Sequence, residues 1–137
     1  NAARATSGLI VGCDIAEGMV RQTVANAAAE RVTNLAGVRA DAHRLPFPDG
    51  AFAAVLCTNG LQVMPGLMQT LSELRRVLAA DGKLYVSVVS MPISSSSEVP
   101  TLVMSRPQLL MSFEAAGFAV ASMRKERLAT LLEAEPA

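Results

Sequence analysis

Five short apolar runs alternate with helical segments along this chain, and that alternation limits the folds the chain can adopt. Two of the runs, residues 8–15 and 51–57, are almost wholly apolar, as in strands that are buried on both faces of a parallel sheet. The pattern therefore predicts an α/β fold with a mostly parallel sheet and flanking helices. The predicted strands cover residues 8–15, 37–40, 51–57, 83–89 and 118–123, and the predicted helices cover residues 17–29, 67–78 and 106–116.

Three further segments complete the outline. Residues 81–82 are Asp-Gly, which predicts a turn into the strand at 83–89. Four serines at 94–97 lie between two prolines, so that no helix or central strand is expected there, and the segment is predicted to be a mobile loop. Residues 128–132 are compatible with a sixth strand or a short helix, and their periodicity leaves both open.

The composition excludes several classes of protein. The chain has 137 residues, which predicts a single domain over 1–137. Half of the residues, 51%, are hydrophobic and 18% are charged, which excludes a disordered chain. Twelve basic residues balance twelve acidic ones, so binding of nucleic acid through bulk positive charge is not expected. Because no run of eighteen apolar residues occurs, no membrane partner is expected either.

The cysteines and the single histidine narrow the chemistry. Cys13 and Cys57 both lie in apolar runs, which favours buried free thiols in a reducing, cytoplasmic compartment over a disulfide. His43 is the only histidine, so a histidine-based metal site or a serine triad is not expected. No metal ligands are predicted.

Polar residues follow three of the predicted strands, at the edge where ligands bind in parallel α/β sheets. Asp14 could accept the hydroxyls of a ribose, or it could cap the following helix. Asp41 could accept an exocyclic amine such as that of adenine, or it could begin a turn. Asn59 is typical of a turn, and His43 is either a loop residue or a weak candidate for a catalytic base.

The order of these motifs resembles the class I S-adenosylmethionine-dependent methyltransferases, which have a Rossmann-like fold. Residues 11–19, VGCDIAEGM, resemble their second-strand motif, and residues 41–52, DAHRLPFPDGAF, resemble their third-strand motif and the loop beyond it. Residues 74–84 and 113–118 are similar to the segments before their fifth and sixth strands. The resemblance covers residues 9–136 and is closest to the branch that methylates metabolites, quinones and lipids.

The resemblance implies S-adenosylmethionine as cofactor and assigns roles to individual residues. Asp14 would bind the ribose hydroxyls and Ile15 would pack on the adenine. Asp41 would accept the adenine amino group, and the backbone of Ala42 would contact the ring edge. Residues near the methionine part and the methyl group would be Thr58 and Asn59, and residues on the substrate side would include Gln62 and Met64.

The chain departs from the family pattern at its front. No counterpart of the family's first strand and glycine-rich loop precedes Gly8, so the sheet is expected to be incomplete at the N-terminal side. In the family that strand lies between the strands that end at Asp14 and near Leu56. These two strands would then pair directly, or a partner strand would fill the position.

Two functions are therefore expected. The first is methyl transfer to a small-molecule acceptor. The alternative is a non-catalytic, truncated methyltransferase-like protein that forms a homodimer or complements a partner through the vacant sheet position. A nicotinamide-dinucleotide domain would share the acid at the second strand, but it does not account for residues 41–52.

Overall fold

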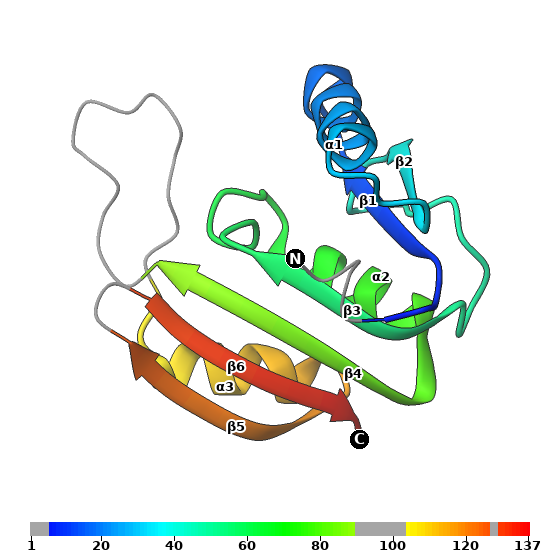
Figure 1. Ribbon diagram of the computed structural model, residues 1–137. Coiled ribbons are helices and arrows are strands. Elements are labelled where there is room, and N and C mark those ends of the chain that lie inside the picture. The colour runs from blue at the N-terminus through cyan, green and yellow to red at the C-terminus, as the bar shows by residue number, and fades with distance from the viewer. Residues whose placement is uncertain (1–5, 90–103, 127–128) are drawn as a thin grey trace, which may run out of the picture. The chain divides into compact units, whose positions relative to one another are not determined.

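The computed structural model describes residues 6–89, 104–126 and 129–137. The predicted serine loop at 94–97 lies outside this part of the chain. Two compact units are present, Asn1–Pro46 and Phe47–Ala137, which we call unit 1 and unit 2 and describe separately (Figure 1). That the two units form one domain stays a prediction.

Unit 1 is a βαβ motif. It contains β1 (Ile10–Asp14), α1 (Glu17–Ala29) and β2 (Leu35–Arg39). The two strands pair in parallel, with Ile10 opposite Leu35 and Asp14 opposite Arg39. α1 lies tightly against β2 at Gly37, where a Cβ atom would come within 2.6 Å of Val24 and 2.8 Å of Val20. The glycine therefore allows the helix to approach the strand.

Unit 2 is a four-stranded mixed sheet in the order β3-β4-β6-β5. Its strands are β3 (Phe52–Thr58), β4 (Leu78–Val89), β5 (Phe118–Glu126) and β6 (Ala129–Pro136), and its helices are α2 (Leu67–Val77) and α3 (Arg106–Ala115). β3 and β4 are parallel, whereas β6 is antiparallel to both β4 and β5. The α/β fold class is confirmed, and in the segment 128–132 that periodicity left open, the described residues from Ala129 onward form a strand.

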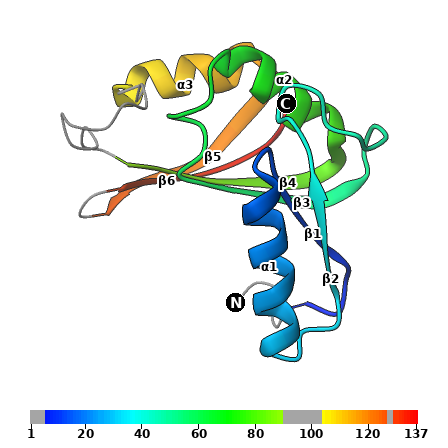
Figure 2. The same ribbon diagram turned by 90° about the horizontal axis from the view of Figure 1, so that it is seen from above.

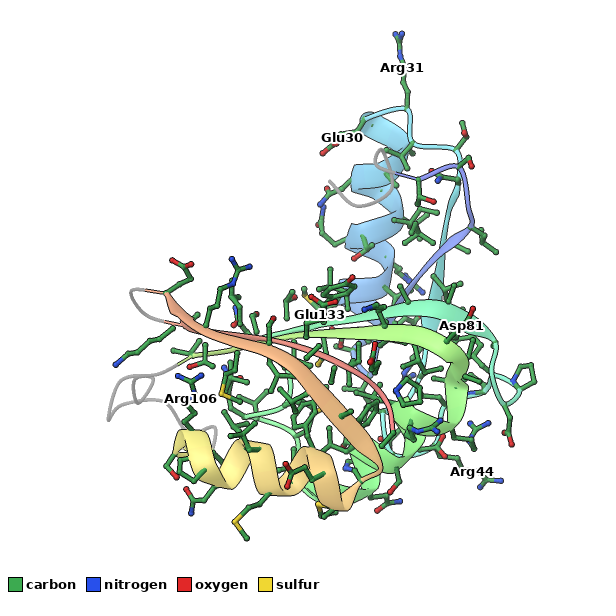
Figure 3. The ribbon with its side chains drawn as sticks, turned by 90° about the horizontal axis from the view of Figure 1, so that it is seen from below. Glu30, Arg31, Arg44, Asp81, Arg106 and Glu133 are labelled. Carbon is green, nitrogen blue, oxygen red and sulfur yellow. The ribbon has the colours of Figure 1, made fainter. Side chains whose placement is uncertain are left out.

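The core of unit 2 lies between the sheet and its helices. Both α2 and α3 cover the same face of the sheet (Figure 2). Arg106 at the start of α3 donates a hydrogen bond to the carbonyl of Met123 in β5 at 2.9 Å (Figure 3). Buried apolar side chains alternate along β4 and β6 and meet those of the helices: Leu71, Leu74, Val77, Leu84, Val86, Val88, Leu109, Phe113, Phe118, Leu132 and Ala134.

Two predictions about unit 2 need correction. β4 begins at Leu78, directly after α2, because Leu78 already pairs with Phe52, and the expected Asp-Gly turn is a bulged part of that strand. β3 is not buried on both faces, because within unit 2 the described helices cover one face only. Leu56 and Tyr85 on the other face are 62% and 41% exposed.

The cysteines also differ in part from the prediction. Both thiols are free, as predicted, but Cys13 is exposed and Cys57 is half-buried. Cys13 lies on β1, whose described neighbours are β2 and α1, and these leave its side chain uncovered. No helix in the described part of the chain is long and apolar enough to cross a bilayer.

Candidate functional site

The carboxyl ends of β1 and β2 bring four of the predicted site residues to one edge of unit 1. The carbonyl of Asp14 accepts a hydrogen bond from the backbone of Ala40 at 3.0 Å. Arg39 Nε donates to the carbonyl of Ile15 at 3.0 Å. These bonds hold Asp14 and Ile15 beside the chain that continues into Asp41 and Ala42.

Asp14 does not cap α1, so the alternative role that its position allowed, a helix cap, is wrong. The N-cap residue is Ala16, and it has no side-chain cap. Asp14 Oδ1 instead accepts a hydrogen bond from the Ala16 backbone at 2.8 Å, which closes a tight turn. This bond uses one of the two carboxylate oxygens, so the group keeps acceptor capacity for a ligand.

Ile15 presents an apolar surface next to this carboxylate. Ile15 is 63% exposed. An adenosine moiety needs a hydrogen-bond acceptor for its ribose hydroxyls and an apolar surface that covers its flat adenine ring. The residues at this edge of unit 1 therefore fit the nucleoside half of S-adenosylmethionine.

Asp41 and His43 form a close pair in the loop after β2. Asp41 Oδ1 accepts a hydrogen bond from the His43 backbone at 2.9 Å and lies 2.7 Å from His43 Nδ1. The Arg44 backbone donates to the Asp41 carbonyl at 3.0 Å, so Asp41 also begins a turn. The His43 backbone N–H and then its imidazole lower the pKa of the Asp41 carboxyl below its ordinary value.

In unit 2, Thr58 and Asn59 lie at the carboxyl end of β3. Asn59 has a left-handed backbone, with φ of 54°, and this turns the chain away from the strand. Its backbone donates to the Ser87 carbonyl at 2.9 Å, and Ser87 Oγ donates to Asn59 Oδ1 at 3.2 Å. Ser87 is a site neighbour that the sequence reading missed, because the pairing of β3 with β4 is needed to find it.

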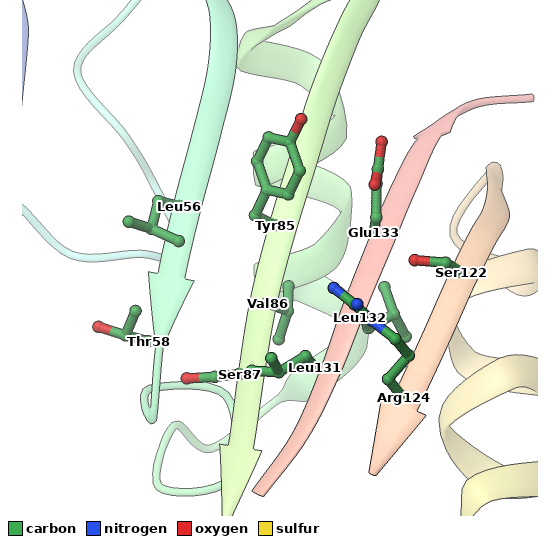
Figure 4. A pocket seen from close by; sticks show the side chains of 10 residues that line it. All are labelled: Leu56, Thr58, Tyr85, Val86, Ser87, Ser122, Arg124, Leu131, Leu132 and Glu133. Carbon is green, nitrogen blue, oxygen red and sulfur yellow. The ribbon is translucent and has the colours of Figure 1, made fainter. Parts of the chain in front are cut away.

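Thr58 and Ser87 line a pocket on the helix-free face of the sheet in unit 2 (Figure 4). Side chains form two rows across the strands, one with Leu56 opposite Tyr85 and the next with Thr58 opposite Ser87. The full lining is Leu56, Thr58, Tyr85, Val86, Ser87, Ser122, Arg124, Leu131, Leu132 and Glu133. The lining therefore combines apolar side chains and hydroxyl-bearing side chains with two charged residues, Arg124 and Glu133.

The residues predicted for the substrate side lie in the loop before α2. Gln62 is 1% exposed, and neither its Nε2 nor its Oε1 has a hydrogen-bond partner among the described residues. The loop is folded closely on itself, since a Cβ atom at Gly60 would lie 2.9 Å from Met64 and 3.1 Å from Cys57. Gln62 therefore lies inside unit 2 rather than on an open surface.

The predicted residues thus form two groups. Asp14, Ile15, Asp41, Ala42 and His43 belong to unit 1, and Thr58, Asn59, Gln62 and Met64 belong to unit 2. The described part of the chain contains no cluster of three or more side chains that could hold a metal ion.

Sequence comparisons match this chain to methyltransferases. A family model described as a methyltransferase domain matches residues 1–86. The demethylmenaquinone methyltransferase of Beutenbergia cavernae is 40% identical over 83 residues, which are 61% of this chain and 32% of that protein. The enzyme of the same name from Thermus thermophilus is 42% identical over 84 residues, which are 61% of this chain and 37% of that protein. The matched part is thus about a third of each relative.

Solved structures show the same fold. The PH0226 protein of Pyrococcus horikoshii superposes with a TM-score of 0.84 at 21% identity, covering 98% of this chain and 74% of that one. A SAM-dependent methyltransferase from Aquifex aeolicus superposes with a TM-score of 0.80 at 18% identity, covering 93% and 68%. The architecture is therefore Rossmann-like.

Proposed function

The chain belongs to the methyltransferase domain family, and on that premise we propose that it transfers the methyl group of S-adenosylmethionine to a small-molecule acceptor. The observation that carries the proposal is the placement of two carboxylates, Asp14 and Asp41, at the carboxyl ends of adjacent parallel strands. Ligands of open α/β sheets bind at this edge. S-adenosylmethionine, the cofactor of this family, supplies an activated methyl group on a sulfonium.

The residues of this chain would then act by binding and orientation rather than by acid–base chemistry. Asp14 would hold the ribose hydroxyls, and Ile15 would cover the adenine with its exposed side chain. Thr58 and Asn59 are proposed to contact the methionine part. The contact between His43 Nδ1 and Asp41 favours a role for His43 in cofactor binding over its role as a base.

Calorimetric titration with S-adenosylhomocysteine tests the cofactor site. Binding at micromolar strength, about −8 kcal/mol, is expected for a working site. Asp14→Ala should weaken binding at least about tenfold, because it removes a charged acceptor of the ribose hydroxyls. Asp81→Ala, which removes an exposed acid in β4, is the matched control and should bind as the parent does. Equal affinity of the Asp14→Ala variant and the parent would contradict the assigned role.

Demethylmenaquinone is the first acceptor to test. We propose a quinone-like acceptor because the relatives from Beutenbergia cavernae and Thermus thermophilus are named for that substrate. The assay follows a labelled methyl group from S-adenosylmethionine into a soluble short-chain demethylmenaquinone. Transfer that Asp14→Ala reduces would support the proposal. Cofactor binding without transfer would contradict the quinone acceptor while leaving the cofactor site in place.

A second candidate function rests on the strand ladders. Among the described strands, β1 pairs with β2 alone and β3 pairs with β4 alone, so β1 and β3 each keep one unpaired edge. An unpaired edge can accept a strand from another chain. We propose as the alternative a non-catalytic protein that dimerises or complements a partner through these edges.

The mass in solution tests this alternative. Light scattering should give twice the chain mass of 14.3 kDa for a homodimer. A strict monomer that binds S-adenosylhomocysteine would contradict the homodimer and favour the enzyme. A dimer without cofactor affinity would favour the alternative.

A further inference from the structure

His43 holds the carboxylate of Asp41 through two bonds to the same oxygen. The His43 backbone donates to Asp41 Oδ1 at 2.9 Å, and the imidazole Nδ1 lies 2.7 Å from that oxygen. The His43 side chain is 21% exposed and the Asp41 side chain is 53% exposed. The imidazole is thus largely enclosed, whereas the carboxylate remains accessible.

This arrangement limits how the Asp41 carboxylate can rotate. Because the carboxylate is planar, holding Oδ1 also sets the direction of Oδ2, and the ring adds a second donor that strengthens the hold of the backbone N–H on Oδ1. The turn bond from the Arg44 backbone to the Asp41 carbonyl, at 3.0 Å, also fixes the backbone from which the side chain projects. The second oxygen, Oδ2, is therefore held in one direction while both donors occupy Oδ1.

We propose that His43 is a positioning residue that presents Oδ2 of Asp41 to the amino group at position 6 of the adenine ring. This inference rests on the proposed function, which assigns Asp41 to the adenine. A carboxylate accepts hydrogen bonds only. Held in one orientation, it attracts a 6-amino group and repels a 6-oxo group. A carboxylate that can rotate accommodates both rings more equally.

His43 therefore sets the selectivity for adenosine over inosine ligands, which a purely structural residue would not do. The test compares the affinities of S-adenosylhomocysteine and S-inosylhomocysteine in the parent, His43→Ala and His43→Asn. In His43→Asn the amide nitrogen lies near the place of Nδ1 and can donate to Asp41. We expect the parent to prefer the adenosine ligand, His43→Ala to lose about tenfold of that preference, and His43→Asn to regain most of it.

The outcomes separate this inference from the proposed function. If the parent binds and discriminates, and His43→Ala keeps the same ratio of affinities, the positioning role is wrong while the cofactor site stands. If His43→Ala weakens both ligands equally and His43→Asn does not restore selectivity, His43 only supports the local fold and the inference is overturned. If the folded parent binds neither ligand, the proposed function and this inference both fail.

Discussion

Units 1 and 2 differ in how much of their apolar surface is buried. In unit 1, Ala27 is the one described apolar side chain that is buried, whereas the other buried apolar side chains of the described chain all belong to unit 2. Yet unit 1 carries the adenosine-binding residues that we propose. Ligand-binding segments often come from the less stable parts of a fold, because binding itself orders them. The comparison indicates that most of the buried apolar core lies in unit 2, whereas the proposed recognition of adenosine would fall to unit 1.

The largest expected effect tests the core of unit 2. Phe113 in α3 is fully buried and its ring lies 5.8 Å from that of Phe118. Phe113→Ala should lower the free energy of unfolding by about 3–5 kcal/mol, because it leaves a cavity. Met111 in the same helix is 68% exposed, so Met111→Ala is the matched control, with an expected change within about 0.5 kcal/mol. Urea denaturation measures both, and similar losses would contradict the assigned core.

A smaller effect is expected from crowding the interior of unit 1. In Gly37→Ala the new Cβ would press on the stiff side chains of Val20 and Val24, at 2.8 and 2.6 Å. We expect a loss of about 1–3 kcal/mol in the stability of unit 1, measured by amide hydrogen exchange in β2. Gly18→Ala in α1, where no atom lies within 4 Å of the new Cβ, is the control. Unchanged exchange in Gly37→Ala would show that α1 does not pack on β2 as described.

Helix capping offers changes of opposite sign in the two units. Ser105 at the start of α3 bonds the Gln108 side chain through its backbone N at 2.9 Å and its hydroxyl at 2.8 Å, whereas Ala16 at the start of α1 has no side-chain cap. Ser105→Ala should cost about 1 kcal/mol, and Ala16→Ser should gain about 0.5–1 kcal/mol. Thermal unfolding of unit 2 and hydrogen exchange in α1 measure the two changes. Changes of the same sign would contradict the capping difference.

The smallest effect concerns pH in unit 1. Because the His43 backbone and then its ring lower the pKa of Asp41, the stabilisation from this pair is present above the unfolded pKa of about 3.9 and is lost as the pH falls through the folded pKa. His43→Ala should raise the pKa of Asp41 in part only, since the backbone donor remains. Carbon-13 NMR titration of the Asp41 carboxyl measures the shift. No change would show that the ring does not bond Asp41 in solution.

Features set by short stretches of sequence were predicted well. β1 ends at Asp14, one residue before the predicted end at Ile15, α1 covers the predicted residues Glu17–Ala29, and Pro107 lies in the first turn of α3. These features depend on local propensities for turns, caps and apolar runs. The turn at Asp41 and its closeness to Asp14 also follow from two adjacent parallel strands.

Features set by distant pairing could not be predicted. The early start of β4 depends on Leu78 meeting Phe52, and the antiparallel place of β6 depends on its partners β4 and β5. The exposure of Cys13 and Leu56 depends on what covers a strand face, which apolar character alone does not reveal. The His43 contact with Asp41 depends on the side-chain geometry of a four-residue turn.

The helix-free face of the sheet in unit 2 has a spectroscopic consequence. Tyr85, in the middle of that face and 41% exposed, is the only tyrosine in the chain, and there is no tryptophan. The intrinsic near-ultraviolet emission of the protein therefore arises from this one phenol, with phenylalanine as a weak background. Whatever approaches the pocket of Figure 4 changes the surroundings of that single fluorophore. The fluorescence of Tyr85 can therefore report binding at this surface without an added label.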